Sequence, residues 1–304
     1  MDRDLLSHLP IVLAVAERGG FAAAAAALDM SPSAVSHAVK VVEDRLGQPL
    51  FARTTRSVAL TEAGAEFVAT AGPAFTAFEE SFTRIRAARG QIVGTLRINS
   101  PRLALPLAIT PAILEMSRRH PELTVEVMSD ERLVDIIEAG FDAGVRLGEM
   151  IAQDMVAVRL TPPFQAIMVA SPAYLDARGT PRSIDDLAAH NCIGYRLIAS
   201  GAAYAWDLRE AGQNVSVTVS GTVRVTDSLH ARDLAREGIG IAYLFEPLVR
   251  DDLRSGRLQQ VLPEASFDEP GLFLYFPRRA AQAPKLRAFI EVVRALADER
   301  TRNG

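Results

Sequence analysis

Two helical segments joined by a tight turn lie within the first 50 residues of the chain. Alanine dominates residues 21–28, which predicts a short helix. The small side chains either allow a neighbouring helix to approach closely or reflect helix propensity alone. Residues 29–32 form the turn, with Ser31 as the N-cap of the next helix and Pro32 in its first position, where a missing N–H is harmless. Gly47 ends that helix. The order predicts a pair of helices packed across a short turn.

The second helix of this pair has two chemically different faces. The apolar face, which must turn to the core, consists of Val35, Val39, Val42 and Leu46. The opposite face is polar and repeats at i, i+3, i+4 and i+7, with Ser33, Ser36, His37 and Lys40. Such side chains at the start of a second helix can form hydrogen bonds with base edges and phosphates, as in a DNA-binding helix-turn-helix. The alternative is the solvated face of an ordinary helical hairpin.

Two short strands, residues 49–51 and 58–60, are predicted after this helix, with a polar loop between them. The hairpin would form a wing beside the helix, and its guanidinium and hydroxyl groups suit phosphate or minor-groove contacts. The predicted DNA-binding residues of helix and wing together are Pro32, Ser33, Ser36, His37, Lys40, Arg53, Thr54 and Arg56.

Overall charge argues against a nucleic-acid partner, because the net charge is −4 and the pI is about 5.8. DNA binding must therefore depend on where single basic residues stand. The apolar run from Leu9 to Ala16 does not fit a secretion signal, since acidic residues precede it and Pro10 interrupts it. No stretch reaches the roughly 20 apolar residues of a membrane span. With Cys192 as the single cysteine, we expect a cytoplasmic protein without a membrane partner.

A further helix is predicted from Thr61 onward, and its apolar residues repeat at the heptad spacing of a coiled coil. The predicted dimerisation residues are Ala71, Phe75, Phe78, Phe82 and Ile85. Pro73 predicts a kink or a local break. The alternative is that the phenylalanines pack on their own domain. Residues 84–94 are predicted as a polar hinge.

Strand-like and helix-like segments alternate through the remaining residues, which predicts an α/β fold. The first set comprises a strand at 95–99, a helix through Arg119, a strand at 123–128, a helix around 133–139 and a strand at 143–147. The second set comprises strands at 164–170, 192–197, 215–225 and 239–245. Two sheet-bearing lobes are expected, in keeping with a length of 304 residues that fits two or three domains.

Several motifs in unbroken order carry a family resemblance. They include Ser31 to Ser36, Leu46-Gly47, Leu50-Phe51, Arg53 to Arg56 and Leu60 to Gly64, and, further on, Phe141 to Gly148, Ala170 to Leu175 and Gly238 to Ala242. The chain resembles the LysR-type transcriptional regulators over nearly its whole length. It departs from their pattern at Gly20, where serine is usual, and at Val12 and Val42, where larger residues are common.

The resemblance implies a complete domain plan. Residues 1–60 would be a winged helix-turn-helix, residues 61–90 a long linker helix that pairs subunits, and residues 91–304 an effector-binding domain similar to periplasmic solute-binding proteins. That domain would have two lobes, about 94–160 with 270–304 and about 161–269, and hold its ligand between them. The partners implied are double-stranded promoter DNA, a small-molecule effector, a second copy in a dimer or tetramer, and RNA polymerase.

Candidate effector-binding residues lie at or just beyond the ends of predicted strands, because ligands of such sheets lie outside the carboxyl ends of strands. They are Ser100, Arg102, Asp130, Arg146 and Thr226. Ser100 matches a position where the family often holds an effector carboxylate, and the arginines would supply positive charge, so an organic acid is expected. The alternatives are that Ser100 only caps, that Arg146 is salt-bridged, and that residues 226–228 only begin a helix. Residues 201–206 would wall the cleft, with Trp206 more typical of a core residue.

The sequence disfavours two other classes of protein. An enzyme is disfavoured, because the sequence has no phosphate-binding glycine loop, no nucleophile elbow and no cysteine–histidine set with metal-ligand spacing. A transport protein that binds solutes would need a secretion signal and would not carry residues 31–61. The sequence therefore predicts a DNA-binding regulator that is not an enzyme and uses no cofactor or metal.

Overall fold

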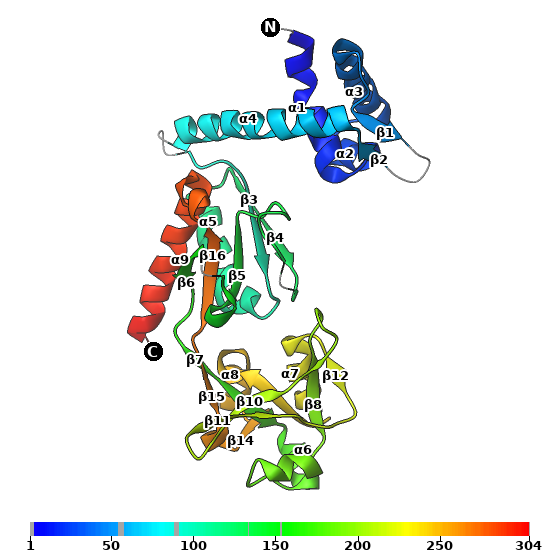
Figure 1. Cartoon of the computed structure of the whole chain (residues 1–304). Coiled ribbons are helices and arrows are strands. Elements are labelled where there is room, and N and C mark those ends of the chain that lie inside the picture. Colours follow the sequence, from blue (N-terminus) through cyan, green and yellow to red (C-terminus); the bar gives the residue numbers. More distant parts are fainter. Residues whose placement is uncertain (1–2, 54–57, 88–90, 133, 153, 304) are drawn as a thin grey trace. The chain divides into compact units, whose positions relative to one another are not determined.

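The computed structural model describes residues 3–53, 58–87, 91–132, 134–152 and 154–303, and it divides into two compact units, Met1–Ile85 and Arg86–Gly304. Each unit is described by itself. The first is helical with a small hairpin (Figure 1): α1 Arg3–Arg18, α2 Phe21–Ala27, α3 Pro32–Leu46, β1 Phe51–Arg53, β2 Val58–Leu60 and α4 Glu62–Ala87. α4 continues across Pro73 without a break in its helical assignment.

The boundaries of α3 follow the predicted signals. The Ser31 side chain accepts a hydrogen bond from the Ala34 N–H at 3.2 Å, Pro32 is the first helical residue, and Gly47 ends the helix with a φ of 68°. Val35, Val39 and Val42 are fully buried and pack with residues of α1 and α2 in one core. Leu46, which was predicted on the same apolar face, is 42% exposed because it is the last residue of the helix.

The hairpin is fastened to both neighbouring helices. Glu43 of α3 accepts hydrogen bonds from the backbone N–H groups of Leu50 and Phe51 at 2.8 and 3.2 Å. Near the start of α4, a Cβ at Gly64 would stand 2.0 Å from the Leu50 carbonyl oxygen, so this close approach requires glycine. The wing and the helix before it therefore form one packed unit.

The second unit has two lobes, each built on its own sheet (Figure 1). The sheet of lobe 1 has the order β4-β3-β5-β16-β6, with β3 parallel to β4 and β5, and β16 antiparallel to β5 and β6. Its strands are β3 Gly94–Ser100, β4 Leu123–Ser129, β5 Ala143–Leu147, β6 Met155–Arg159 and β16 Leu272–Pro277. A π-helical turn at Leu105–Ile109 leads into α5 Thr110–Arg119, which packs beside α9 Pro284–Asn303.

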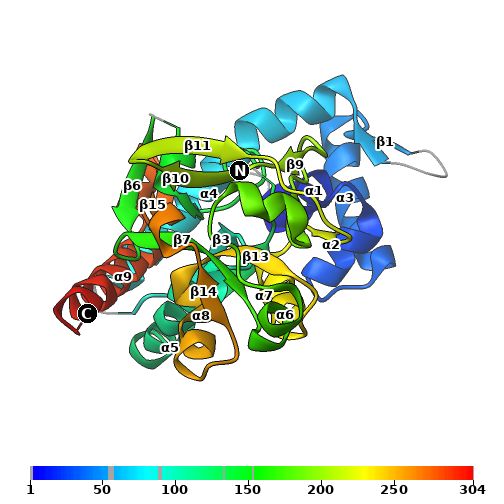
Figure 2. The ribbon, with the colours of Figure 1, turned by 90° about the horizontal axis from the view of Figure 1, so that it is seen from below.

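The main sheet of lobe 2 has the order β12-β8-β13-β7-β14, with β15 paired to β7 and β9 to β8. Its elements are β7 Phe164–Ala170, α6 Pro172–Arg178, β8 Cys192–Arg196, β9 Ala203–Tyr204, β12 Arg224–Val225, α7 Ser228–Arg236, β13 Ile241–Phe245, α8 Glu246–Arg254, β14 Gln259–Val261 and β15 Phe267–Glu269. A separate antiparallel hairpin of β10 Trp206–Glu210 and β11 Gln213–Val217 completes the lobe (Figure 2).

The α/β class, the winged helix-turn-helix and the two lobes are confirmed, but two predicted elements are wrong. Residues 136–140 form hydrogen-bonded turns instead of a helix, as in the bond from the Phe141 N–H to the Ile136 carbonyl. Residues 215–225 are not one strand, because Gln213–Val217 pairs with β10 while Arg224–Val225 joins β8 in the main sheet. Alternating apolar residues do not reveal that the chain changes sheets at residues 218–223.

The two lobes are joined by two crossing segments that contact each other. The Leu272 N–H donates to Thr161 Oγ1 at 2.9 Å, and the Leu160 N–H donates to the Leu272 carbonyl at 2.8 Å. Gly271 has a φ of +93°, and a Cβ there would stand 2.7 Å from the Pro162 carbonyl oxygen. Only glycine accommodates both conditions, so the crossing is locally constrained.

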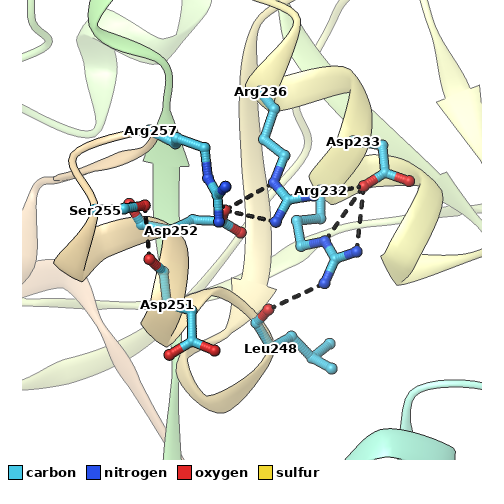
Figure 3. A network of polar contacts seen from close by, with 8 residues as sticks. All are labelled: Arg232, Asp233, Arg236, Leu248, Asp251, Asp252, Ser255 and Arg257. Carbon is cyan, nitrogen blue, oxygen red and sulfur yellow. Dashed lines mark hydrogen bonds and ion pairs between the residues drawn. The ribbon is translucent and has the colours of Figure 1, made fainter.

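Two helices of lobe 2 are held together by a buried carboxylate (Figure 3). The Asp252 side chain of α8 is 1% exposed, and it accepts hydrogen bonds from Arg236 of α7 at 2.6 and 2.8 Å. Arg257 donates to the same carboxylate at 2.9 Å. The side chains of Arg236 and Arg257 are 29% and 58% exposed, so both keep contact with water. Their two positive charges compensate the buried negative charge of Asp252.

In the part of the chain that is described, no single helix has the length and apolar composition to cross a membrane. The required length and composition are reached only when residues 5–18 of α1 are taken together with α2. The axes of these two helices are bent by 119° at the break between them.

Candidate DNA-binding surface and effector cavity

The polar face of α3 lies at the surface of the first unit. Pro32, Ser33, His37 and Lys40 are exposed, and Ser36 is half-buried. Ser33 is within 2.9 Å of the Ser31 hydroxyl, so the N-cap and the first polar residue share a hydrogen bond. The stripe is displayed on a helix whose other side is locked into the core, which gives it a rigid support.

The wing is an antiparallel pair in which Phe51 opposes Leu60 and Arg53 opposes Val58. Arg53 is the last residue of β1. Thr54 and Arg56 lie outside the described residues, so their predicted contacts stay predictions. The hydrogen bonds that Glu43 accepts from the N–H groups of Leu50 and Phe51 fix the base of the wing against α3.

The predicted dimerisation residues form an apolar seam on α4. Phe78, Phe82 and Ile85 are 60%, 57% and 59% exposed, whereas Ala71 and Phe75 are half-buried. The rings of Phe78 and Phe82 are 4.9 Å apart between centroids. Exposed aromatic rings along one helix are unfavourable in water, so this exposure disfavours the alternative that these side chains pack on their own domain.

A cavity of about 380 Å³ lies between the two lobes of the second unit. Lobe 1 lines it with Pro101, Leu103, Glu131, Arg146, Leu147, Met150 and Leu272, and the principal lining from lobe 2 is Tyr195, Leu197, Ile198, Tyr204, Trp206, Asp207, Tyr243, Phe245 and Glu269. A cavity of this size that is mostly apolar with a few polar groups is typical of a small-molecule site.

Arg146 is the one predicted effector residue in the lining. Its side chain is buried, and its terminal nitrogens donate to the Val145 carbonyl at 2.6 Å, to Asn99 Oδ1 at 2.7 Å and to the Arg132 carbonyl at 2.6 Å. Burial lowers the pKa of this guanidinium, because the charged form loses water contacts.

The other predicted effector residues lie around the cavity but outside its lining. Ser100 is fully buried and donates to the Pro101 carbonyl at 3.2 Å. Arg102 forms an ion pair with Asp227 of lobe 2. Asp130 holds Arg132 at 2.7 Å, and this bond lowers the pKa of the carboxyl group. The Thr226 carbonyl accepts a hydrogen bond from Tyr195 at 2.7 Å.

Several lining residues were missed from the sequence. Glu131 directly follows a residue that was chosen, and burial raises the pKa of its carboxyl group. Tyr195, Tyr204, Asp207 and Tyr243 come from separate strands of lobe 2. No local motif marks them, since only the folded sheet and hairpin bring them together.

Trp206 is a core residue that is 1% exposed, as expected, although it also borders the cavity. Cys192 is likewise buried, and burial raises the pKa of its thiol to about 12. Within the described ranges, no group of three or more histidine, cysteine, aspartate or glutamate side chains is placed to hold a metal ion.

A helix-turn-helix with a wing, followed by a two-lobed domain with a cavity between the lobes, is the arrangement of a transcription regulator that has an effector-binding domain. Two family models match this chain: "Bacterial regulatory helix-turn-helix protein, lysR family" over residues 6–65 and "LysR substrate binding domain" over residues 89–298. The chain belongs to the LysR family of transcriptional regulators.

Relatives match over almost their full length. The HTH-type transcriptional regulator YcaN of Escherichia coli, described as uncharacterized, is 35% identical over 95% of this chain and 94% of the relative. A putative transcriptional regulator of Pseudomonas aeruginosa is 39% identical over 96% of this chain and 94% of the relative. Among solved structures, the LysR-type regulator CrgA from Neisseria meningitidis is 29% identical, covers 95% of this chain and 98% of its own, and has a TM-score of 0.61.

Proposed function

We propose that this regulator binds specific promoter DNA through Pro32, Ser33, Ser36, His37, Lys40, Arg53, Thr54 and Arg56. The observation that carries the proposal is the polar stripe of α3, which lies exposed opposite a buried apolar stripe on a helix with fixed ends. Residues near the start of such a helix reach base edges in the major groove, and the wing arginines suit the backbone.

The proposed division of labour assigns DNA binding to residues 1–60, subunit pairing to 61–90 and effector binding to 91–304. Few basic residues lie on the DNA-binding face, so one copy has few phosphate contacts. A dimer or tetramer formed along the α4 seam would link two or more such faces, and linkage raises affinity without new contacts. The protein would act in the cytoplasm, with RNA polymerase as a further partner.

The inter-lobe cavity is the proposed effector site. An effector that binds one arrangement of the lobes more tightly than another would raise the population of that arrangement. The expectation of an organic acid rests on Arg146, the single basic side chain among the residues that line the cavity in the described part of the chain. The proposed residues around it remain Ser100, Arg102, Asp130 and Thr226.

DNA binding is tested with a duplex enriched by the protein from a random library, measured by fluorescence anisotropy. Lys40→Ala should weaken binding by about tenfold, since one good contact is worth roughly 1–3 kcal/mol. Arg18→Ala removes the same charge from an exposed site at the end of α1 and is the matched control. Unchanged affinity of a normally folded Lys40→Ala variant, or equal loss in both variants, would remove α3 from the DNA interface.

A further inference from the structure

The side chains that line the inter-lobe cavity carry more negative than positive charge. Glu131, Asp207 and Glu269 are carboxylates, whereas Arg146 is the one basic residue in the lining as far as the chain is described. Both terminal nitrogens of that guanidinium already donate to protein oxygens. A ligand anion would therefore meet a net negative wall, and a ligand cation would be attracted to it.

Asp207 is held among aromatic rings. The Tyr204 hydroxyl donates to Asp207 Oδ2 at 2.5 Å, and the Tyr243 hydroxyl donates to the Asp207 carbonyl at 2.5 Å. The Tyr243 ring stacks on Trp206 with centroids 5.5 Å apart. Asp207 Oδ1 accepts no hydrogen bond from the described residues. Asp207 therefore contributes a fixed carboxylate to the lining, and a carboxylate attracts the positive charge of an ammonium group.

Apolar side chains at the same cavity remain accessible to water. Met150, Leu197 and Ile198 line it and are 45%, 39% and 45% exposed. Exposed apolar groups gathered at a cavity are covered when an apolar ligand enters, and their burial favours binding. The body of the ligand must therefore be apolar and of metabolite size.

One buried donor in the lining lacks an acceptor. Arg146 is 3% exposed, and its Nε atom has no hydrogen-bond partner among the described residues. Buried donors are almost always satisfied in folded proteins. A ligand oxygen that accepts from this N–H would complete the site, in addition to the cationic group.

We propose that the effector is not the organic acid expected from Arg146 alone but a small organic amine, cationic at neutral pH, whose apolar body fills the cavity and whose ammonium group binds Asp207. This inference rests on the proposed role of the cavity as the effector site. Glu131 belongs to lobe 1 and Asp207 to lobe 2, so a cation between them attracts both lobes. Amine binding would thereby favour a closed arrangement of the lobes, which is the differential affinity that a regulator requires.

The test is isothermal titration calorimetry of the full-length protein with three probes that share one aromatic body: tyramine, tyrosine and 3-(4-hydroxyphenyl)propionate. The two amines should bind at least about tenfold more tightly than the propionate, which lacks the ammonium group. Asp207→Asn should remove that preference, because it keeps the shape and removes the charge. Asp268→Asn, an exposed carboxylate of lobe 2 outside the cavity lining, is the control and should leave the preference unchanged.

Comparison of the probes on the unaltered protein needs no variant, so it stands even if Asp207→Asn folds poorly. Propionate binding as tight as tyramine binding, or no binding of either amine, would overturn the inference. Retention of the amine preference in a folded Asp207→Asn variant would overturn the role of Asp207. Failure of the proposed function would appear separately, as loss of sequence-specific DNA binding by the ligand-free protein.

Discussion

Arg102 of lobe 1 and Asp227 of lobe 2 form an ion pair beside the inter-lobe cavity. The chain neighbours of these residues, Pro101, Leu103 and Ser228, line the cavity itself. Asp227 also caps α7, because its Oδ1 accepts from the Leu229 N–H at 2.7 Å. The lobes are therefore joined by an ion pair next to residues that line the cavity.

Removal of this pair should shift the lobes toward more open arrangements. Arg102 is 56% exposed, so the pair is worth at most about 1 kcal/mol, which corresponds to roughly a fivefold change in population. Spin labels at Arg118→Cys in lobe 1 and Asp185→Cys in lobe 2 would report it as a longer and broader distance distribution in Arg102→Ala. Arg209→Ala breaks an ion pair within lobe 2 and should leave the distribution as it is. An identical distribution in all three proteins would show that the pair does not hold the lobes.

The apolar seam of α4 should control the oligomeric state. Phe78→Glu places a charge where a second copy would pack, so the assembly should dissociate toward monomer in light scattering coupled to size-exclusion chromatography. Thr76→Glu adds the same charge at an exposed position of α4 outside the heptad seam. If Phe78→Glu leaves the mass unchanged, the seam is not the interface between copies.

The Asp252 carboxylate should be a major contributor to the stability of lobe 2. Asp252→Ala removes the hydrogen bonds from Arg236 and Arg257, and because both arginines keep contact with water it should lower the free energy of unfolding by about 2 kcal/mol. Urea unfolding followed by fluorescence measures it, because Trp206 is the single tryptophan and lies in this lobe. Asp251→Ala, at a side chain that is 87% exposed, should have little effect. Equal losses for both variants would contradict the structure.

Glu131 should make the protein less stable as its carboxyl group ionises. Burial raises the pKa of Glu131 above the ordinary value of 4.5, so the folded state favours the protonated form. The stability from this preference is complete below the ordinary value and is lost as the pH rises through the raised one. Glu131→Gln should therefore melt at a higher temperature at about pH 8, with the difference shrinking as the pH falls toward about 5. A difference that is constant with pH would contradict this assignment.

The sequence predicts the first unit well because its signals are local. Ser31, Pro32 and Gly47 mark the ends of α3 by chemistry that acts within a few residues, and the alternation of faces follows from helical spacing. The residues that line the cavity are less predictable from the sequence. Arg146 lies in a strand next to the cavity, but Asp207 enters the lining through a hairpin that the sequence did not predict as separate.

The same contrast explains the two wrong elements. Residues 136–140 carry apolar residues that suit a helix, yet they complete a turn before β5. Residues 215–225 alternate like one strand although the chain leaves one sheet for another. Both errors arise where long-range pairing, which no local pattern contains, decides the structure.

The central claim is that this acidic chain recognises a particular DNA sequence through α3 and the wing. The most direct test is the anisotropy-based affinity of the full-length protein, at one fixed salt concentration, for its library-enriched duplex and for a scrambled duplex of the same composition. We predict that the enriched duplex binds at least about a thousandfold more tightly, which is the lower end of the usual margin of specific over non-specific binding. Equal affinity for the two duplexes would contradict the account.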